Sequence, residues 1–410
     1  MAPLNNISSL LDWIKFTHNR CILKSTLPQC LATETDGTYG DEADSEACAW
    51  KNKTVSWLDI FMTGIYILIR VISVIFNIKL AVDYYHQGER HYCIWTVVCM
   101  VVPMCVTALI YAKMCYQDKK FDGGIKEATK TTILVLVSSV FLRYWNTLIY
   151  SVKCKRAELQ GNRDEQLEYY NSTTKEESDI ALIRLFECFM ETAPQKILLL
   201  SIILMQENQI SATQILMVLL YLLSVPGTLF SYNRCIRAAQ PNKNKLSYWY
   251  MAPHLCWHFC ISISRIFCIA FVAALFPLWL IVSCILHAVT LGFVTYIVER
   301  PEFSSAIAFH NFLFCIALGF VYIFIYIPVK EAPTRYKYAM YYLICSIENI
   351  ICVVLFIYNP PNHLRESPRL FYAICILAVA LYYVGIICML IYYKNYHPNV
   401  KASRNKKTIG

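Results

Sequence analysis

Arg184, Glu187 and Glu191 lie inside one long apolar stretch of this sequence, at residues 179–205. Arg184 and Glu187 are three residues apart and Glu187 and Glu191 are four apart, so on an α-helix all three share one face. An arginine so placed can hold a phosphate group through two hydrogen bonds, and carboxylates can pair with it. Because a charge at the bilayer centre costs about 2.5–3.5 kcal/mol, this face must point at protein or at a hydrated cavity.

Pro194 follows the charged face closely. It removes one backbone donor and leaves the carbonyl of Met190 without its helical partner, which predicts a kink beside Glu191. A plainer interpretation is a buried ion pair of Arg184 with Glu187 that only fixes this helix against its neighbours. That pair does not account for Glu191, so a functional polar site is the working hypothesis.

The composition indicates the setting of this helix. Hydrophobic residues make up 57% of the 410 and charged residues 16%, against about a quarter charged in soluble domains. Each apolar stretch is near the ~20 residues of a spanning helix, and none alternates as a barrel strand does. We therefore predict an all-α polytopic membrane protein with apolar stretches at 58–79, 93–112, 129–150, 179–205, 211–233, 250–273, 275–298, 306–328, 338–358 and 369–393.

Several kinds of chemistry have no motif here. The sequence contains neither G-x-x-x-x-G-K nor G-x-G, so ATP-driven pumping is not supported. His254 and His258 are four residues apart on one helix face, but two ligands without a third favour polar packing over a zinc site. We predict no metal, no cofactor, no nucleic-acid partner and no enzymatic activity.

Basic residues predict the topology, because short loops rich in Lys and Arg stay in the cytosol. The basic connections are 113–128, 151–178 and 234–249. All three fall on one side only if 129–150 enters and leaves the membrane on the same face. Its Arg143 suits such a half-inserted segment.

The same arrangement at 306–328 places 80–92 and 359–368 outside and both termini in the cytosol. Each half then has four spans and one half-inserted segment, which predicts two parallel repeats. Cys188-x-x-Glu191 and Cys345-x-x-Glu348 occupy corresponding places in them. The predicted domains are a cytosolic leader at 1–57, a first repeat at 58–236, a second repeat at 250–393, and a basic cytosolic tail at 394–410.

The run IRLFECFMETAPQ at 183–195, followed by Lys196, resembles the signature of the XK-related family of phospholipid scramblases. The resemblance extends over 58–398 and ends in the run IYYKNYHPN. It implies eight transmembrane helices with two re-entrant segments, and an energy-independent scramblase of the plasma membrane that exposes phosphatidylserine. Asn77 and Lys79 depart from the family, whose members often carry acidic residues in the first span.

The resemblance also implies residue roles. Trp95 resembles a family tryptophan that closes the outer mouth of the lipid path. The family's charged interior positions, which we take as the lipid path, are matched by Arg143, Asp179, Arg184, Glu187, Glu191, Arg265 and Glu348.

The leader contains an acidic segment of small residues, which predicts an accessible linker. Asp44 ends the run DEAD and is followed by Ser45, the form that an executioner caspase cuts. Asp36 ends TETD and lacks the distal aspartate. Upstream, Ile7 to Ile14 have helical apolar spacing that suits a surface helix. We predict that cleavage in the leader activates the protein during apoptosis, although an idle acidic linker would have the same composition.

Two other functions are compatible with intramembrane charges. A secondary transporter of a small polar solute would also use repeats and midplane charges. A non-transporting subunit of another membrane protein would use the charges as ion pairs. The expected partners of a scramblase are membrane phospholipids including phosphatidylserine, an executioner caspase, and as a further candidate a single-span accessory protein.

Overall fold

A computed structural model describes residues 54–117, 144–205, 212–238, 248–299, 308–327 and 335–396. Within these residues the chain is helical and contains no strand. Seven of the described helices are long and apolar enough to cross a membrane. The prediction of an all-α polytopic membrane protein is therefore confirmed.

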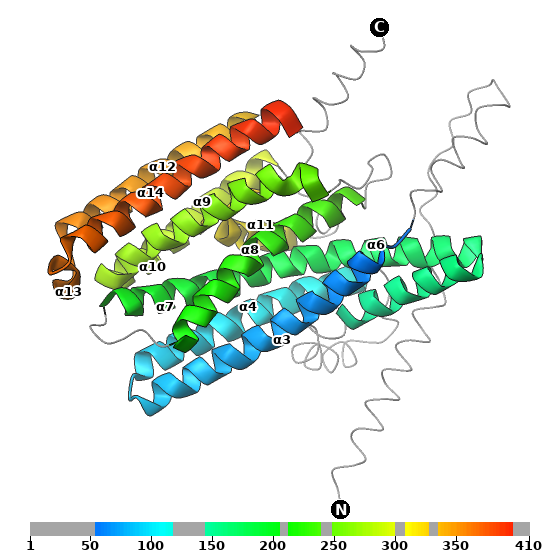
Figure 1. Cartoon of the computed structure of the whole chain (residues 1–410), viewed down its shortest axis with the longest axis horizontal. Helices are drawn as coiled ribbons and strands as arrows, with labels where there is room; N and C mark the ends of the chain where they lie inside the picture. Colours follow the sequence, from blue (N-terminus) through cyan, green and yellow to red (C-terminus); the bar gives the residue numbers. More distant parts are fainter. Residues whose placement is uncertain are drawn as a thin grey trace, which may run out of the picture.

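The described helices follow the expected apolar stretches (Figure 1). Several extend beyond them, whereas the helices within 275–298 and 306–328 are shorter than predicted. The stretch predicted at 179–205 is the second part of a helical run from Arg163 to Met205. In chain order the elements are α3 (Trp57–His86), α4 (Arg90–Gln117), a helix over 144–160, α6 (Arg163–Phe186), the π-helix η1 (Glu187–Thr192), α7 (Ala193–Met205), α8 (Ala212–Ala238), α9 (Tyr248–Leu275), α10 (Pro277–Val298), α11 (Ala308–Tyr322), α12 (Arg335–Tyr358), α13 (Asn362–Arg365), α14 (Pro368–Ile391) and the π-helix η2 (Tyr392–Tyr396).

Local sequence determines where several helices begin. Ser56 caps α3, because its hydroxyl accepts from the Leu58 amide while the Asp59 carboxylate accepts from the Ser56 amide, each at 3.2 Å. Proline is the first residue of both α10 and α14, where its missing N–H costs no hydrogen bond.

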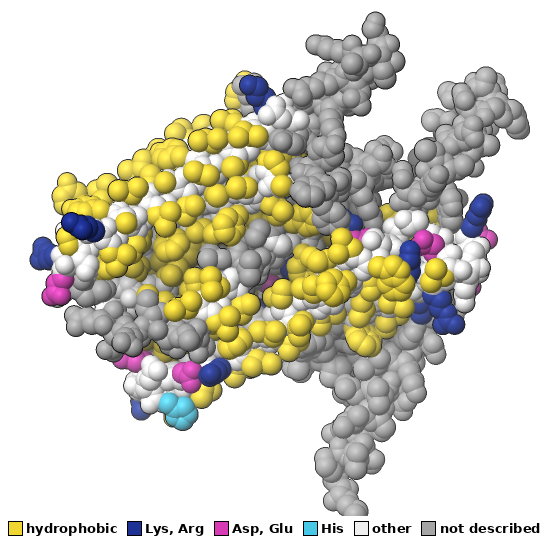
Figure 2. Space-filling view, in the orientation of Figure 1, with side chains coloured by type: hydrophobic (Ala, Val, Ile, Leu, Met, Phe, Trp, Pro, Cys, Tyr) yellow, Lys and Arg dark blue, Asp and Glu magenta, His cyan; other side chains and the backbone are white. Residues whose placement is uncertain are grey.

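The helix α9 lies at the centre of the bundle. Of its most apolar window 72% is buried inside the protein, against 17% for α10. It packs against α7, α8, α12 and α14. Figure 2 shows the complementary surface, where hydrophobic side chains cover most of the helical body and charged ones gather toward its two ends. Such a surface suits a helix bundle surrounded by lipid.

The ends of the helices agree with the relative topology predicted from the basic loops. The start of α3, the end of α14 and the turn before α6 lie at one end of the bundle (Figure 1). The α3–α4 turn and α13 lie at the opposite end. Which end faces the cytosol stays a prediction.

The segment between α10 and α12 leaves and returns at the same end of the bundle. Lys337, near the start of α12, donates to Glu299, just after α10, at 2.7 Å. Between them α11 has only 15 residues, about 22 Å of helix, and is followed by non-helical residues 323–327. This is the geometry expected for the half-inserted stretch 306–328. Of its counterpart at 129–150, residues up to 143 lie outside the described ranges.

Two glycines let α10 and α11 pack backbone against backbone. A Cβ on Gly292 would lie 2.7 Å from the Cys315 carbonyl oxygen, and one on Gly319 would overlap the Ala288 carbonyl oxygen. Close approach through small residues is how helices associate in lipid, where no hydrophobic force drives them together. The short helix is therefore held mainly by α10.

Candidate functional site

The helix carrying the signature widens at the predicted kink. Residues Glu187–Thr192 form a π-helix directly before Ala193 and Pro194. The Thr192 hydroxyl donates to the Glu187 carbonyl, five residues earlier, at 3.4 Å. A π-turn accommodates the missing proline donor with wider spacing, and such turns are frequent at functional sites.

The partner of the two glutamates is Arg70 on α3. Its Nη1 and Nη2 donate to the Glu191 carboxylate at 2.8 and 2.7 Å, and its Nε lies 3.7 Å from Glu187 Oε2. Glu191 is fully buried, and Arg70 is 7% exposed. The shared face of Glu187 and Glu191 is as the spacing predicted. The ion pair of Arg184 with Glu187 is not found, because Glu187 lies beside Arg70 instead.

Arg184 lies between two tyrosine rings. Its guanidinium carbon is 3.9 Å from the ring centre of Tyr66 on α3 and 5.1 Å from that of Tyr144. Its Nε donates to the Tyr144 hydroxyl at 3.3 Å, and its Nη1 donates to Ser231 on α8 at 2.6 Å. No carboxylate lies within ion-pair distance of it in the described part of the chain. Rings and hydroxyls orient this cation without neutralising it.

A cavity of about 210 Å³ lies between α3, α8 and the helical run from α6 to α7. Its charged lining residues are Arg70, Arg184, Glu187 and Lys196. Lys196 is 5% exposed and has no ion-pair partner among the described residues, and Glu187 Oε1 has no hydrogen-bond partner. Counting Glu191, which binds Arg70, three cations face two carboxylates around this cavity. The site therefore has an excess of one positive charge when all five groups are ionised.

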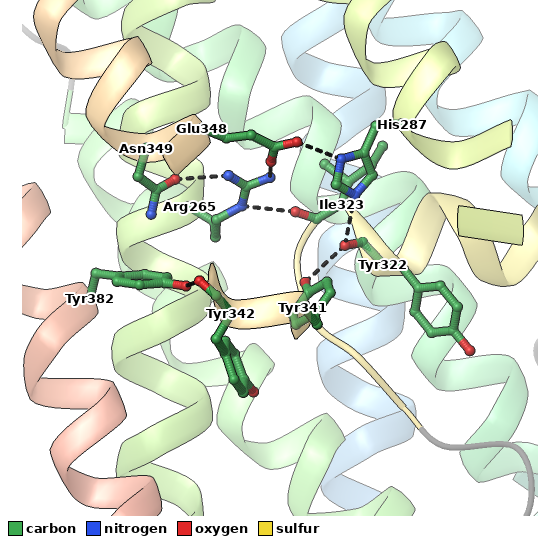
Figure 3. A network of polar contacts seen from close by, with 9 residues as sticks. All are labelled: Arg265, His287, Tyr322, Ile323, Tyr341, Tyr342, Glu348, Asn349 and Tyr382. Atoms are coloured by element: carbon green, nitrogen blue, oxygen red, sulfur yellow. Dashed lines mark hydrogen bonds and ion pairs between the residues drawn. The ribbon is translucent and has the colours of Figure 1, made fainter. Parts of the chain in front are cut away.

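A second polar network lies in the other half of the bundle (Figure 3). All three guanidinium nitrogens of Arg265 on α9 are engaged: Nε with the Ile323 carbonyl at 2.9 Å, Nη1 with Asn349 at 2.8 Å, and Nη2 with Glu348 at 2.8 Å. The other Glu348 oxygen contacts Nδ1 of His287 at 2.8 Å. Arg265 is 3% exposed. Each guanidinium nitrogen of this arginine thus already has a protein acceptor, and one of these acceptors is a carboxylate.

The network satisfies the backbone where α11 ends. Carbonyl groups at a helix end lack partners, and inside a membrane no water replaces them. The Tyr322 carbonyl accepts from the Tyr341 hydroxyl at 2.8 Å and lies 3.2 Å from His287 Nε2, while the Ile323 carbonyl accepts from Arg265 (Figure 3). The contacts point to anchoring of the returning segment.

The structure thus brings only part of the predicted lipid path together. Arg184 and Glu187 line the large cavity and Glu191 binds there through Arg70, whereas Arg265 and Glu348 do not line it. Asp179 lies on α6, partly buried, and Trp95 on α4 is 42% exposed; neither lines the cavity. Arg143 lies outside the described residues.

Three other sequence predictions concern the caspase-like sites, the histidine pair and metal binding. The caspase-like sites at Asp36 and Asp44 lie outside the described residues. His254 and His258 are both buried and contact each other through Nε2 at 3.1 Å. In the described part of the chain no group of three or more candidate ligands could hold a metal ion.

Sequence reasoning missed the neighbours of the charged residues. Arg70 is visible as a charge inside an apolar stretch, but its partner Glu191 is 121 residues away and no local spacing connects the two. Nothing in the sequence marks Tyr66 and Tyr144 as neighbours of Arg184, because tyrosine is common throughout the chain.

The fold and site define a polytopic α-helical membrane protein with an intramembrane cavity lined by charged side chains. The family model described as XK-related protein matches residues 61–398. That match covers most of the chain, and the chain belongs to the XK-related family.

Proposed function

We propose that this protein is an energy-independent phospholipid scramblase of the plasma membrane that exposes phosphatidylserine on the outer leaflet. The observation that carries the proposal is the intramembrane cavity where three cations face two carboxylates. A headgroup cannot cross hydrocarbon unaided, because its charges would lose their water without compensation. A cavity with excess positive charge reduces that cost for a phosphate.

The lining residues supply the two kinds of contact that a phospholipid headgroup needs. Arg184 and Lys196 have no carboxylate partner among the described residues, so each is available to a phosphate oxygen. Glu187 Oε1 has no hydrogen-bond partner and is available to the ammonium group of a serine or ethanolamine headgroup. The acyl tails stay in lipid beside α3 and α8, whose outward residues are apolar, such as Leu68 and Leu219.

Regulation is part of the proposal. A scramblase that is always open would abolish lipid asymmetry, and a caspase cut is an irreversible trigger. Cleavage after Asp44, or less efficiently after Asp36, would release the leader with its apolar residues Leu10 to Ile14. In this proposal the leader holds the cytosolic end of the path closed, so a chain beginning at Ser45 exposes phosphatidylserine without a death signal.

Liposomes reconstituted with the purified protein and a head-labelled lipid test the activity. An impermeant quencher reaches the inner-leaflet label only if lipid crosses, while an entrapped polar dye reports leakage. We expect quenching beyond half of the label without dye release. Quenching that stops at half in both the full chain and the chain from Ser45 contradicts the proposal, and solute flux with no lipid movement favours a transporter.

Site variants connect that activity to the cavity. Arg184→Gln or Lys196→Gln should slow scrambling about tenfold or more, because each removes a charge-assisted hydrogen bond of about 1.5–3 kcal/mol. Arg369→Gln, an exposed arginine at the start of α14, is the matched control and should scramble normally. If Arg184→Gln, Lys196→Gln and Glu187→Gln all fold and scramble at the normal rate, the cavity is not the path.

A further inference from the structure

A second, smaller cavity of about 50 Å³ adjoins the first. It lies toward the start of α3, where Asp59 and Arg234 form an ion pair between α3 and α8. Both cavities are lined by Met62, Tyr66 and Arg184, and by no other shared residue. These three side chains therefore form the wall between the two cavities.

Tyr66 is the largest part of that wall and is fixed on two sides. Its hydroxyl donates to the Gly227 carbonyl of α8 at 3.0 Å, and its ring lies against the Arg184 guanidinium at 3.9 Å. Gly227 lies close against the tyrosine, since a Cβ there would be in van der Waals contact with the hydroxyl oxygen at 3.7 Å. The Tyr66 side chain thus connects α3 with α8 and lines both cavities.

The two cavities have different polar groups. The small one is lined by Asp59, Glu177 and Arg234, and the large one extends from the wall to Lys196. The two cavities therefore lie one after the other from the start of α3 toward the middle of the bundle, with the wall of Met62, Tyr66 and Arg184 between them.

We propose that Tyr66 is the gate of this passage, closed in the structure described here, and that it opens by breaking the bond to Gly227 and swinging off Arg184. This inference rests on the proposed lipid path, because the gate would control movement along it. The gate itself can be tested without lipid, by the access of a water-soluble reagent to the two cavities. Arg184 then acts at the gate, because a phosphate that binds its guanidinium competes with the tyrosine ring for one of its faces.

Two cysteines of the natural sequence allow the gate to be tested without lipid, through the rates at which they are modified. Cys235 lines the small cavity and Cys188 lines the large one. A charged, water-soluble methanethiosulfonate should modify Cys235 in the unaltered protein, and peptide mass spectrometry should find Cys188 modified at least tenfold more slowly. In Tyr66→Ala the Cys188 rate should rise at least tenfold, whereas Tyr66→Phe, which keeps the ring, should resemble the unaltered protein more closely than Tyr66→Ala does.

Tyr85→Ala, an exposed tyrosine on the same helix, is the matched control and should leave both cysteine rates unchanged. If Tyr66→Ala does not give a monodisperse protein, Tyr66→Leu replaces it, since leucine keeps apolar packing without a ring over the guanidinium. Equal rates at Cys188 and Cys235 in the unaltered protein, or no rise at Cys188 in the folded variant, overturn the gate.

Scrambling in liposomes separates the gate from the proposed function. Faster lipid movement in Tyr66→Ala than in the unaltered protein, together with faster Cys188 labelling, supports both. Faster labelling with no lipid movement in any variant supports the gate and refutes the scramblase. Normal scrambling in the unaltered protein with neither rate changed in Tyr66→Ala refutes the gate alone.

Discussion

The ion pair of Arg70 with Glu191 is the most deeply buried charge contact at the cavity, and Glu191→Gln should destabilise the protein strongly. Two hydrogen bonds of 2.8 and 2.7 Å join the pair, and Glu191 is fully buried. Glutamine keeps one acceptor but turns its amide donors toward the guanidinium donors. Removing one partner of such a pair costs about 3–5 kcal/mol, chiefly because the other charge stays buried.

The neighbouring carboxylate of Glu187 determines how strongly Glu191→Gln destabilises the protein. Its carboxylate is 3.7 Å from Arg70 and has one oxygen without a hydrogen-bond partner, so it can move onto the guanidinium. We expect Glu191→Gln to cost about 3 kcal/mol and the double variant with Glu187→Gln about 5 kcal/mol. Changing Arg70→Met and Glu191→Met together in the Glu187→Gln background removes all three charges of this ion-pair cluster and should restore most of the loss.

Unfolding in mixed detergent micelles, titrated with sodium dodecyl sulfate and followed by tryptophan fluorescence, measures these differences. Glu366→Gln, an exposed glutamate after α13, is the matched control and should change the free energy of unfolding by less than about 0.5 kcal/mol. A Glu191→Gln protein as stable as the unaltered one would contradict this expectation. So would a triple variant less stable than Glu191→Gln alone.

Three more outcomes follow from the topology, the close helix packing and the leader. Cysteines introduced in 80–92 and 359–368 should react with an impermeant reagent outside intact cells, while those in the basic loops should not; the reverse pattern would invert the topology. Gly319→Ala should prevent α11 from docking and cause loss of the monodisperse protein, because a Cβ there overlaps α10 backbone; normal folding would show that the helices can separate cheaply. Asp36→Ala with Asp44→Ala should block phosphatidylserine exposure in apoptotic cells, and normal exposure would place control elsewhere.

Hydropathy was sufficient to predict the helices, and helical spacing was sufficient to place Glu187 and Glu191 on one face. Both are local properties of the chain. The proline predicted a disturbance beside Glu191, but its form, a π-helix rather than a bend, depends on how the neighbouring helices pack and could not be predicted.

Partners of the charges are not local, so they could not be predicted in the same way. The three-residue spacing favours Arg184 as the partner of Glu187. In the fold, Arg70 takes both carboxylates and Arg184 turns to two tyrosines. Which pairing forms is decided by the approach of α3, which the sequence alone does not specify.

The two halves of the protein use the same kind of ion pair differently. Arg70 with Glu191 and Arg265 with Glu348 each join the first span of a predicted repeat to its fourth apolar stretch. In the second half, the end of α11 has carbonyls that need donors, and Arg265 supplies one of them. Each of its guanidinium nitrogens thereby donates to the protein, with Ile323, Asn349 and Glu348 as acceptors.

In the first half, Arg184 lines the cavity beside Arg70 but is not committed to a carboxylate in this way. Arg184 donates to two hydroxyl groups, and its charge faces rings instead of carboxylates. A hydroxyl can be exchanged for a phosphate oxygen at little cost, because a charge-assisted bond replaces a neutral one. A carboxylate partner would have to be displaced against its own attraction. The proposed path therefore runs through the first half, and the second half supports the returning segment beside it.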